Sequence, residues 1–246
     1  MAKSYPHKAG NGRRRFLTSA LLALLTLATA PAIATESPIT PFQLQYRLKA
    51  QGIPFAVTAN RTLKALGDGQ WQMEVVASNV LGEIRETSRF VWNGCTPVSR
   101  FYGYRRKGLG QLKEAEVRIP AGGATATAKR SGKADRQYPV PAAAVTDKIS
   151  LTLALQCRLA RGERNLTLHV ADERELESQH YLVEGEETLS INGNPITTVK
   201  VRRDRSGNSP RQTWLWFAPE YGYTLVQLVQ ENEDGRHVMT LQGALP

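Results

Sequence analysis

The sequence has few of the residues from which reactive sites are usually built. Its 246 residues include only two cysteines and four histidines. It contains no H-E-x-x-H or C-x-x-C pair, no G-x-S-x-G or S-x-x-K signature and no glycine-rich phosphate loop. The motifs of zinc enzymes, common serine hydrolases and nucleotide-binding proteins are therefore missing. The sequence predicts no cofactor and no metal site, and it gives no positive sign of an enzyme.

Acidic residues are missing from the amino end, which makes the net charge misleading. Five basic and no acidic residues precede residue 35, and they account for half of the formal net charge of +10. The remainder has 27 basic against 22 acidic residues, so its charge does not indicate nucleic acid as a partner. Hydrophobic residues make up 41% and charged residues 22%. This balance excludes disordered, collagen-like and multi-span membrane classes.

The first 34 residues have the three parts of a cleavable export signal. A basic stretch ends at Arg15, an uncharged run follows, and small residues lead to an A-x-A site at Ala32-Ile33-Ala34. We expect cleavage after Ala34 and a periplasmic location, with no transmembrane anchor left afterwards. A retained anchor is the alternative, because the stretch 16–34 is almost long enough to span a bilayer. No cysteine precedes Cys95, which excludes a lipid anchor on a cysteine just after the signal.

The residues around the basic stretch indicate which export route the chain would use. Arg13-Arg14-Arg15-Phe16-Leu17 fits the R-R-x-F-L core of a twin-arginine signal. Gly12 and Thr18 depart from the fuller pattern, so general secretion is favoured over the twin-arginine route.

Period-two alternation of apolar and polar residues recurs from residue 42 onward and predicts a strand-rich fold. Turn signals such as Asn93-Gly94 and Asn192-Gly193-Asn194 separate the segments at hairpin spacing. Expected strands include 42–48, 53–59, 70–77, 83–92, 98–104, 114–119, 166–170, 179–189, 196–203, 212–217, 223–230 and 237–242. We therefore expect one mature domain, residues 35–246. It would be a mainly β, curved antiparallel sheet that closes partly or fully into a barrel.

Two segments depart from the strand pattern. Residues 147–160 alternate like a strand but have the Leu, Ala, Gln and Arg content of a helix. We predict a buried helix over Asp147–Ala160, capped at its start by Thr146 or Asp147 and lying against the concave side of the sheet; capping is also the structural reading of Ser150. The stretch 121–144 is rich in alanine, threonine, lysine and proline, and we interpret it as a long, mobile loop.

The two cysteines form an even pair in a chain that is expected to be exported. In an oxidising compartment Cys95 and Cys157 are candidates for a disulfide. Two separate buried thiols are the alternative, because Cys157 lies in an apolar stretch. The residues leave both readings open.

Aromatic and basic side chains occur together in two places and are the candidate ligand-binding residues. In an exported protein such residues would meet anionic lipid, polysaccharide or peptidoglycan rather than nucleic acid. Core aromatics beside a solvated hairpin are the alternative reading. The predicted ligand-binding residues are Phe101, Tyr102, Tyr104, Arg105, Arg106, Lys107, Trp214 and Trp216.

Three segments together resemble a known family. They are Asp147-Lys148-Ile149-Ser150 with 151–159, the segment 192–201, and Trp214-Leu215-Trp216-Phe217-Ala218-Pro219. In order and spacing they resemble domain-of-unknown-function family 3108 (DUF3108), over most of residues 40–244. The resemblance implies an exported bacterial β-rich envelope protein with one helix and no established activity.

We therefore expect a non-catalytic binding or chaperone-like module for an apolar or anionic envelope ligand, such as lipid, peptidoglycan or polysaccharide. The first alternative is a structural protein that offers a strand edge to another envelope protein. A hydrolase using Asp147, Ser150 or surface carboxylates ranks last. The ligand, the partner and the oligomeric state stay open.

Overall fold

The computed structural model describes residues 37–51, 56–108, 110, 112–205, 207, 209–233 and 235–245, all of which belong to one compact unit. The expected export signal lies outside the described residues, as does the start of the expected strand 53–59.

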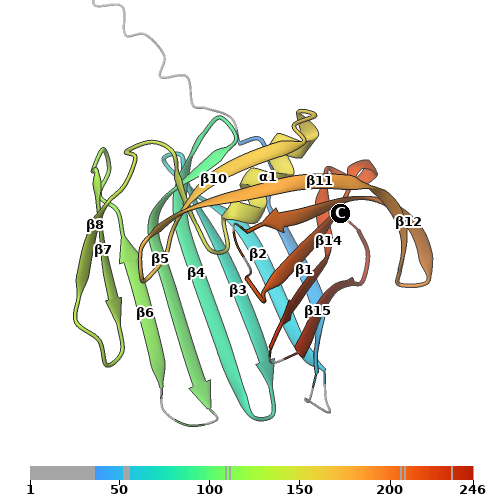
Figure 1. Ribbon diagram of the computed structural model, residues 1–246, viewed down its shortest axis with the longest axis horizontal. Helices are drawn as coiled ribbons and strands as arrows, with labels where there is room; N and C mark the ends of the chain where they lie inside the picture. The colour runs from blue at the N-terminus through green and yellow to red at the C-terminus, as the bar shows by residue number, and fades with distance from the viewer. Residues whose placement is uncertain are drawn as a thin grey trace, which may run out of the picture. The chain divides into compact units, whose positions relative to one another are not determined.

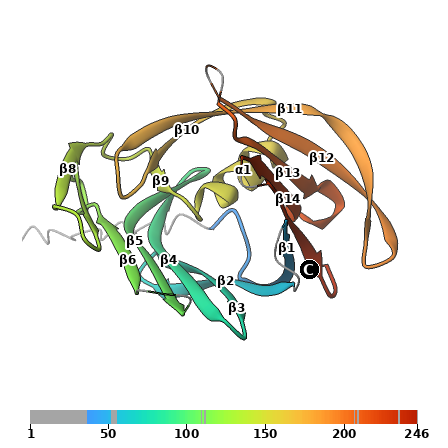
Figure 2. The same cartoon turned by 60° about the horizontal axis from the view of Figure 1, so that its bottom comes forward.

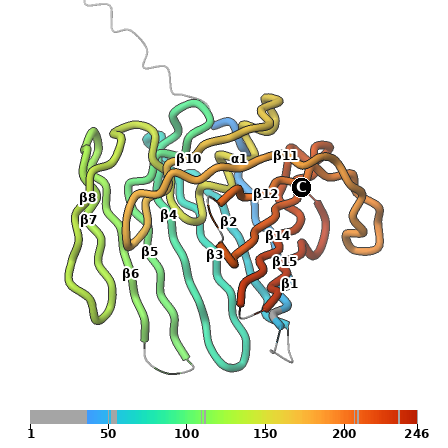
Figure 3. Tube along the Cα trace, viewed as in Figure 1, coloured from blue at the N-terminus to red at the C-terminus, as the bar shows by residue number. Residues whose placement is uncertain are grey.

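The described residues form fifteen strands in one hydrogen-bonded sheet (Figure 1). Neighbours along the chain pair as antiparallel hairpins, apart from β9, which is parallel to β10. The first strand β1 also pairs with the last strand β15, so the first and last strands of the chain lie side by side (Figure 3). The strands are β1 Phe42–Ala50, β2 Val57–Gly67, β3 Gln70–Asn79, β4 Gly82–Asn93, β5 Thr96–Gly108, β6 Lys113–Arg118, β7 Thr125–Arg130, β8 Arg136–Pro139, β9 Val145–Asp147, β10 Asn165–Ala171, β11 Leu176–Ile191, β12 Asn194–Asp204, β13 Gln212–Ala218, β14 Thr224–Asn232 and β15 Gly235–Gln242.

The sheet curves strongly but does not close, because its two edge strands, β8 and β9, do not pair with each other (Figure 2). Strand β9 instead lies against β5 on the inner face. A hydrogen bond of 2.5 Å from the Tyr138 hydroxyl on β8 to the Asp172 carbonyl also ties one edge to the β10–β11 turn. The predicted mainly β fold with a curved antiparallel sheet is confirmed, in its partly closed form.

The one α-helix among the described residues, α1 (Leu151–Ala160), lies inside the curve of the sheet, against β5, β9, β10 and β14 (Figure 2). It is apolar on most sides, as predicted, and six of its residues are buried. The predicted start at Asp147 is wrong by four residues, because Val145–Asp147 pair with β10 as a strand. A short 3₁₀ helix, η1, follows β13 at Pro219–Tyr221.

The interpretation of residues 121–144 as a loop is wrong where this stretch forms the hairpin of β7 and β8. In β7 the side chains of Ala126 and Ala128 are fully buried while Thr125 and Lys129 are exposed. The period-two pattern is therefore present. It is carried by alanine, which is not a strand-favouring residue.

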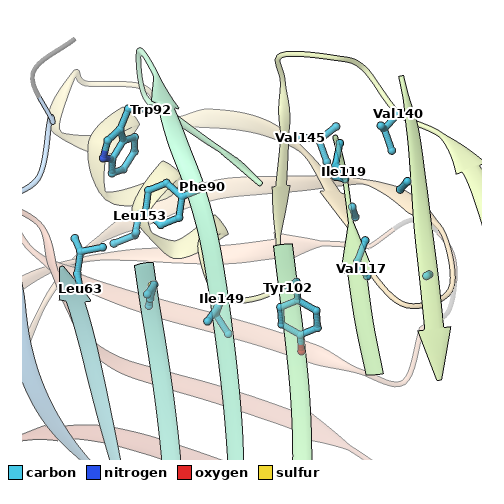
Figure 4. Close-up of a cluster of buried hydrophobic side chains, with 14 of the residues drawn as sticks. Leu63, Phe90, Trp92, Tyr102, Val117, Ile119, Val140, Val145, Ile149 and Leu153 are labelled. Carbon is cyan, nitrogen blue, oxygen red and sulfur yellow. The ribbon is translucent and has the colours of Figure 1, made fainter. Parts of the chain in front are cut away.

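The core divides into three clusters of buried side chains. The first joins the inner faces of β2–β7 to the start of α1, the second lies between α1 and β10–β14, and the third lies between β1 and β11–β15. In the first, Phe90 and Trp92 meet edge to face with ring centroids 5.2 Å apart. Figure 4 shows Leu153 of α1 beside Phe90. The helix thus occupies part of the space that the curved sheet encloses.

A disulfide joins Cys95, in the β4–β5 turn, to Cys157 in α1, with their Cα atoms 5.4 Å apart. The predicted bridge is confirmed, and the alternative of two separate buried thiols is wrong. The bond spans 62 residues of sequence. Closing a loop of that length lowers the entropy of the unfolded chain by an amount worth about 4 kcal/mol in the chain-entropy model. It ties the helix to one rim of the sheet.

Candidate functional site

The predicted ligand-binding residues lie in several separate places. Tyr102 is buried in the first core cluster, whereas Trp216 is buried in the third and Trp214 packs against it. The Trp216 indole N–H donates a hydrogen bond to Glu187. The structure therefore does not bring the two predicted aromatic groups into one pocket.

Phe101, Tyr104 and Arg105 line a hollow of about 470 Å³ over β4–β7. The Phe101 ring covers Gly103, where a Cβ atom would lie only 2.9 Å from the ring. The Arg118 guanidinium lies 4.9 Å from the centre of that ring. The aromatic face is thus already covered by the chain's own arginine, and Arg105 is paired with Glu114.

A buried carboxylate lies where β4, β5 and β9 meet the start of α1. Asp147 is fully buried, and one of its oxygens accepts hydrogen bonds from the Ser88 and Ser99 hydroxyls at 2.6 and 2.7 Å. The other accepts from the backbone N–H groups of Ile149 and Ser150 at 3.2 and 3.0 Å. We call these five residues the Asp147 cluster. Burial raises the pKa of Asp147 above its usual value, while these hydrogen bonds act in the opposite direction.

Beside the Asp147 cluster, two further carboxylates have opposite pKa shifts. Burial raises the pKa of Glu86, which accepts a 2.5 Å hydrogen bond from the Tyr102 hydroxyl. Burial acts in the same direction on Glu173, but the paired Lys148 ammonium, a backbone hydrogen bond and the charge of Arg174 together lower its pKa. No set of three or more His, Cys, Asp and Glu side chains suited to a metal ion occurs among the described residues.

The bonds around Asp147 and Ser150 account for both residues as structural groups. The Ser150 hydroxyl lies 2.8 Å from the Thr146 hydroxyl and accepts a hydrogen bond from the Asp147 N–H. Both side chains therefore hold the chain as it turns from β9 into α1.

A second cavity lies on the inner face of the sheet, between the first turn of α1, the β10–β11 turn and β11–β14. We call it the arginine cleft. Its volume is about 520 Å³, within the range of small-molecule sites. Buried or half-buried apolar side chains form its floor, and three arginines stand at one wall. The floor residues are Leu151, Val170, Tyr181, Leu215 and Leu228, and the arginines are Arg203, Arg205 and Arg211.

Of the three arginines, only Arg203 forms an ion pair with another described residue. Arg203 forms an ion pair with Glu177, yet its Nε–H is buried without a partner. None of the ion pairs between described residues includes Arg205 or Arg211, and Arg205 donates only to Thr213 Oγ1 and the Arg211 carbonyl. Burial and the charges of Arg203 and Arg211 lower the pKa of Arg205 to about 10. Burial and Arg203 also lower the pKa of Arg211. Arg205 and Arg211 stay positive at neutral pH. The lining of the cleft also includes the carboxylates of Asp172, Glu173, Glu175 and Glu177, so the excess of positive charge is confined to the wall formed by the arginines.

Sequence reasoning missed the arginine cleft although a signal was present. Arg203 and Arg205 are two residues apart, so an extended chain points both to the same face. Arg211 follows six residues later, before the next strand. Two basic residues on the face of a strand that also carries its buried apolar residues are the signal by which the site could have been predicted.

The free strand edges offer little for a partner strand. Strand β8 is four residues long and ends in Pro139, which has no N–H to donate. All three residues of β9 are buried.

In the part of the chain that the structure describes, no helix combines the length and apolar character needed to cross a bilayer. None of the curated proteins matches this chain. Among solved structures, a crystal structure of a β-barrel-like protein of domain of unknown function DUF1849 from Brucella abortus is similar. It has a TM-score of 0.55 and 9% identity, with 82% of this chain and 95% of that chain covered. At this identity the likeness shows the fold alone.

Residues 45–242 match the family described as "Protein of unknown function (DUF3108)". This range holds the Asp147 cluster, the disulfide and the arginine cleft. The expected resemblance is confirmed, and the chain belongs to the DUF3108 family.

Proposed function

We propose that this chain is an exported, non-catalytic binding protein that holds an anionic ligand with an apolar part in the arginine cleft. The observation that carries the proposal is the pair Arg205 and Arg211, which line the cleft and form no ion pair with any described residue, although Glu177 lies close enough to stabilise their charges. Charged groups held close together and partly desolvated destabilise one another until an anion neutralises them.

The shape of the cleft supports the ligand class. Guanidinium groups bind carboxylate and phosphate through paired hydrogen bonds. The apolar floor lies within the same cavity, so an anionic head on Arg205 and Arg211 places a short hydrocarbon or ring over Leu215 and Leu228. This combination favours an amphiphilic anion over a purely polar one.

Isothermal titration calorimetry with dodecyl phosphate tests the proposal, and dodecyltrimethylammonium serves as the probe of opposite charge. We expect the unchanged protein to bind the phosphate only. Arg205→Gln with Arg211→Gln should weaken this binding at least tenfold, because each charged hydrogen bond contributes about 1.5–3 kcal/mol. Arg89→Gln is the matched control, since Arg89 is exposed on β4 and bonds to Gln72.

Equal binding of both probes, or equal weakening by Arg89→Gln, would overturn the proposed site. Native mass spectrometry of gently purified protein then identifies the natural ligand, and we expect a bound anionic amphiphile that the double variant lacks. The export part is tested separately. A periplasmic fraction should hold a chain that begins at Thr35, and intact chain in the cytoplasm would contradict it.

A further inference from the structure

Exposed apolar side chains gather at one end of the sheet. Five large hydrophobic side chains are exposed among the described residues, and four of them lie where the β3–β4 turn meets the start of β6. Their exposed fractions are 93% for Val80, 41% for Leu81, 37% for Ile84 and 46% for Leu112. We call these four residues the apolar tip. The lower end of the sheet in Figure 1 shows the β3–β4 turn beside the ends of β5 and β6.

The strand pairing holds these segments together although they are distant in sequence. Ile84 on β4 pairs with Arg106 on β5, and Arg106 pairs with Lys113 on β6, next to Leu112. The β3–β4 turn is packed so closely against β5 that a Cβ atom on Gly82 would lie 2.4 Å from the Lys107 carbonyl. The tip is therefore formed by adjoining strand ends.

The chain fixes the exposed turn in place. The Asn79 side-chain oxygen accepts hydrogen bonds from the backbone N–H groups of Leu81 and Gly82 at 2.8 and 3.1 Å. This Asx-type turn projects Val80 away from the sheet. Exposure of the Val80 side chain to water is unfavourable, and moving this side chain into an apolar phase lowers the free energy.

Basic side chains without ion-pair partners surround the tip. None of the ion pairs between described residues includes Arg106, Lys107 or Lys113, whereas the neighbouring Arg85 and Arg105 are each paired with glutamates. The Arg106 Nε–H is also buried without a hydrogen-bond partner. We call Arg106, Lys107 and Lys113 the basic collar. The apolar tip and the basic collar together match a surface with negative charge outside and hydrocarbon beneath.

We propose that this end of the sheet docks on the surface of an anionic lipid bilayer. The apolar tip enters the interface while the basic collar contacts lipid phosphates. A protein partner fits less well, because a stable interface takes about 20–30 residues from each side, and only four exposed apolar residues gather here. Insertion of a few side chains needs no such area, since its strength grows with each buried CH₂ group and each basic residue.

Vesicle flotation tests the docking, with phosphatidylcholine vesicles and vesicles that also contain phosphatidylglycerol. All variants are compared in the same form of the chain, so any contribution of the first 36 residues is common to all. We expect binding to the anionic vesicles only, weakening as salt is raised. Val80→Ser with Leu81→Ser, and separately Lys107→Gln with Lys113→Gln, should each lower the partition coefficient about tenfold.

Leu66→Ser with Lys64→Gln is the matched control, because both residues are exposed near the opposite end of β3. These changes should leave flotation unchanged. Arg205→Gln with Arg211→Gln should also float normally, which separates docking from capture of lipid in the arginine cleft. Equal flotation of the tip and collar variants with the unchanged chain would overturn the proposal, as would equal binding to neutral vesicles.

Discussion

Two groups of charged side chains face the interior of the curved sheet, and they differ in how well their charges are satisfied. Asp147 is fully buried, and both of its oxygens accept hydrogen bonds from the chain itself. Arg205 and Arg211 are half-buried or exposed, lie near a third arginine and form no ion pair with a described residue, although Glu177 acts on both at longer range. The hydrogen bonds of the first group are all made within the chain, whereas the proposed function assigns an anion from outside to the second.

This difference distinguishes a structural polar group from a binding one. Buried groups whose hydrogen bonds are all made within the chain stabilise one arrangement, and removing one partner leaves the others unsatisfied. Groups of like charge without partners destabilise the empty protein and favour a ligand. Mutation of Asp147 should therefore lower the stability of the protein. Mutation of Arg205 and Arg211 should instead weaken ligand binding and change the stability little.

The largest expected effect is on the Asp147 cluster. Asp147→Ala should lower the free energy of unfolding by about 3 kcal/mol, because two hydroxyl groups and two backbone N–H groups lose their acceptor inside the core. Relief from burying the carboxylate offsets part of this loss. Urea unfolding followed by circular dichroism measures the change.

Asp147→Asn is the matched control. Its side-chain oxygen still accepts from the backbone N–H groups of Ile149 and Ser150, and the hydroxyls of Ser88 and Ser99 can rotate to accept from its amide. We expect a loss of about 1 kcal/mol. Equal losses in the two variants would show that the hydrogen bonds do not hold the start of the helix.

A second comparison sets one arginine against another. Arg61 is 5% exposed and donates to Tyr46 Oη at 3.1 Å and to Thr152 Oγ1 at 2.8 Å. Arg61→Gln should therefore lower the free energy of unfolding by about 2 kcal/mol. Arg205→Gln should change it by less than about 0.5 kcal/mol, because the lost hydrogen bonds are offset by relief from Arg203 and Arg211.

Urea unfolding near pH 7 compares these two variants with the unchanged protein. A loss at Arg205 as large as that at Arg61 would mean that Arg205 supports the fold, and it would remove the distinction between the two groups. A loss of stability in the Arg61 variant alone would support the distinction between structural and binding groups.

The sequence predicted the strands and the helix because their signals are local. Alternation such as Phe42, Leu44, Tyr46 and Leu48 needs only neighbouring residues to be recognised. The start of α1 could not be predicted this way, because Val145–Asp147 become a strand only through pairing with β10, 24 residues further along the chain. The hairpin of β7 and β8 was missed because alanine carries its inward face.

The candidate site was harder to predict because it depends on long-range packing. The sequence predicts both Trp216 and Tyr102 as ligand-binding aromatic residues, yet the curvature of the sheet places them in different core clusters. The arginine cleft needs the β12 end, the start of β13 and α1 to meet around one cavity. Spacing along the chain marks residues of one strand that share a face. It does not show which strands face each other across the curve.

The smallest expected effect compares Glu86 and Glu173, two glutamates beside the Asp147 cluster with opposite shifts. Burial raises the pKa of Glu86 above 4.5, so its folded state binds extra protons in the window above that value, and stability falls as pH rises through it. Lys148 contributes to lowering the pKa of Glu173 despite burial, so Glu173 contributes stability above pH 4.5 that is lost as pH falls.

As the pH rises from about 4 to about 7, the unchanged protein should lose stability relative to Glu86→Gln. Over the same range it should gain stability relative to Glu173→Gln. The Glu173 difference should be about 1 kcal/mol or less, because the Lys148–Glu173 pair is partly exposed to solvent. Urea midpoints at both pH values give the two slopes, and slopes of the same sign would show that Lys148 does not set the charge of Glu173.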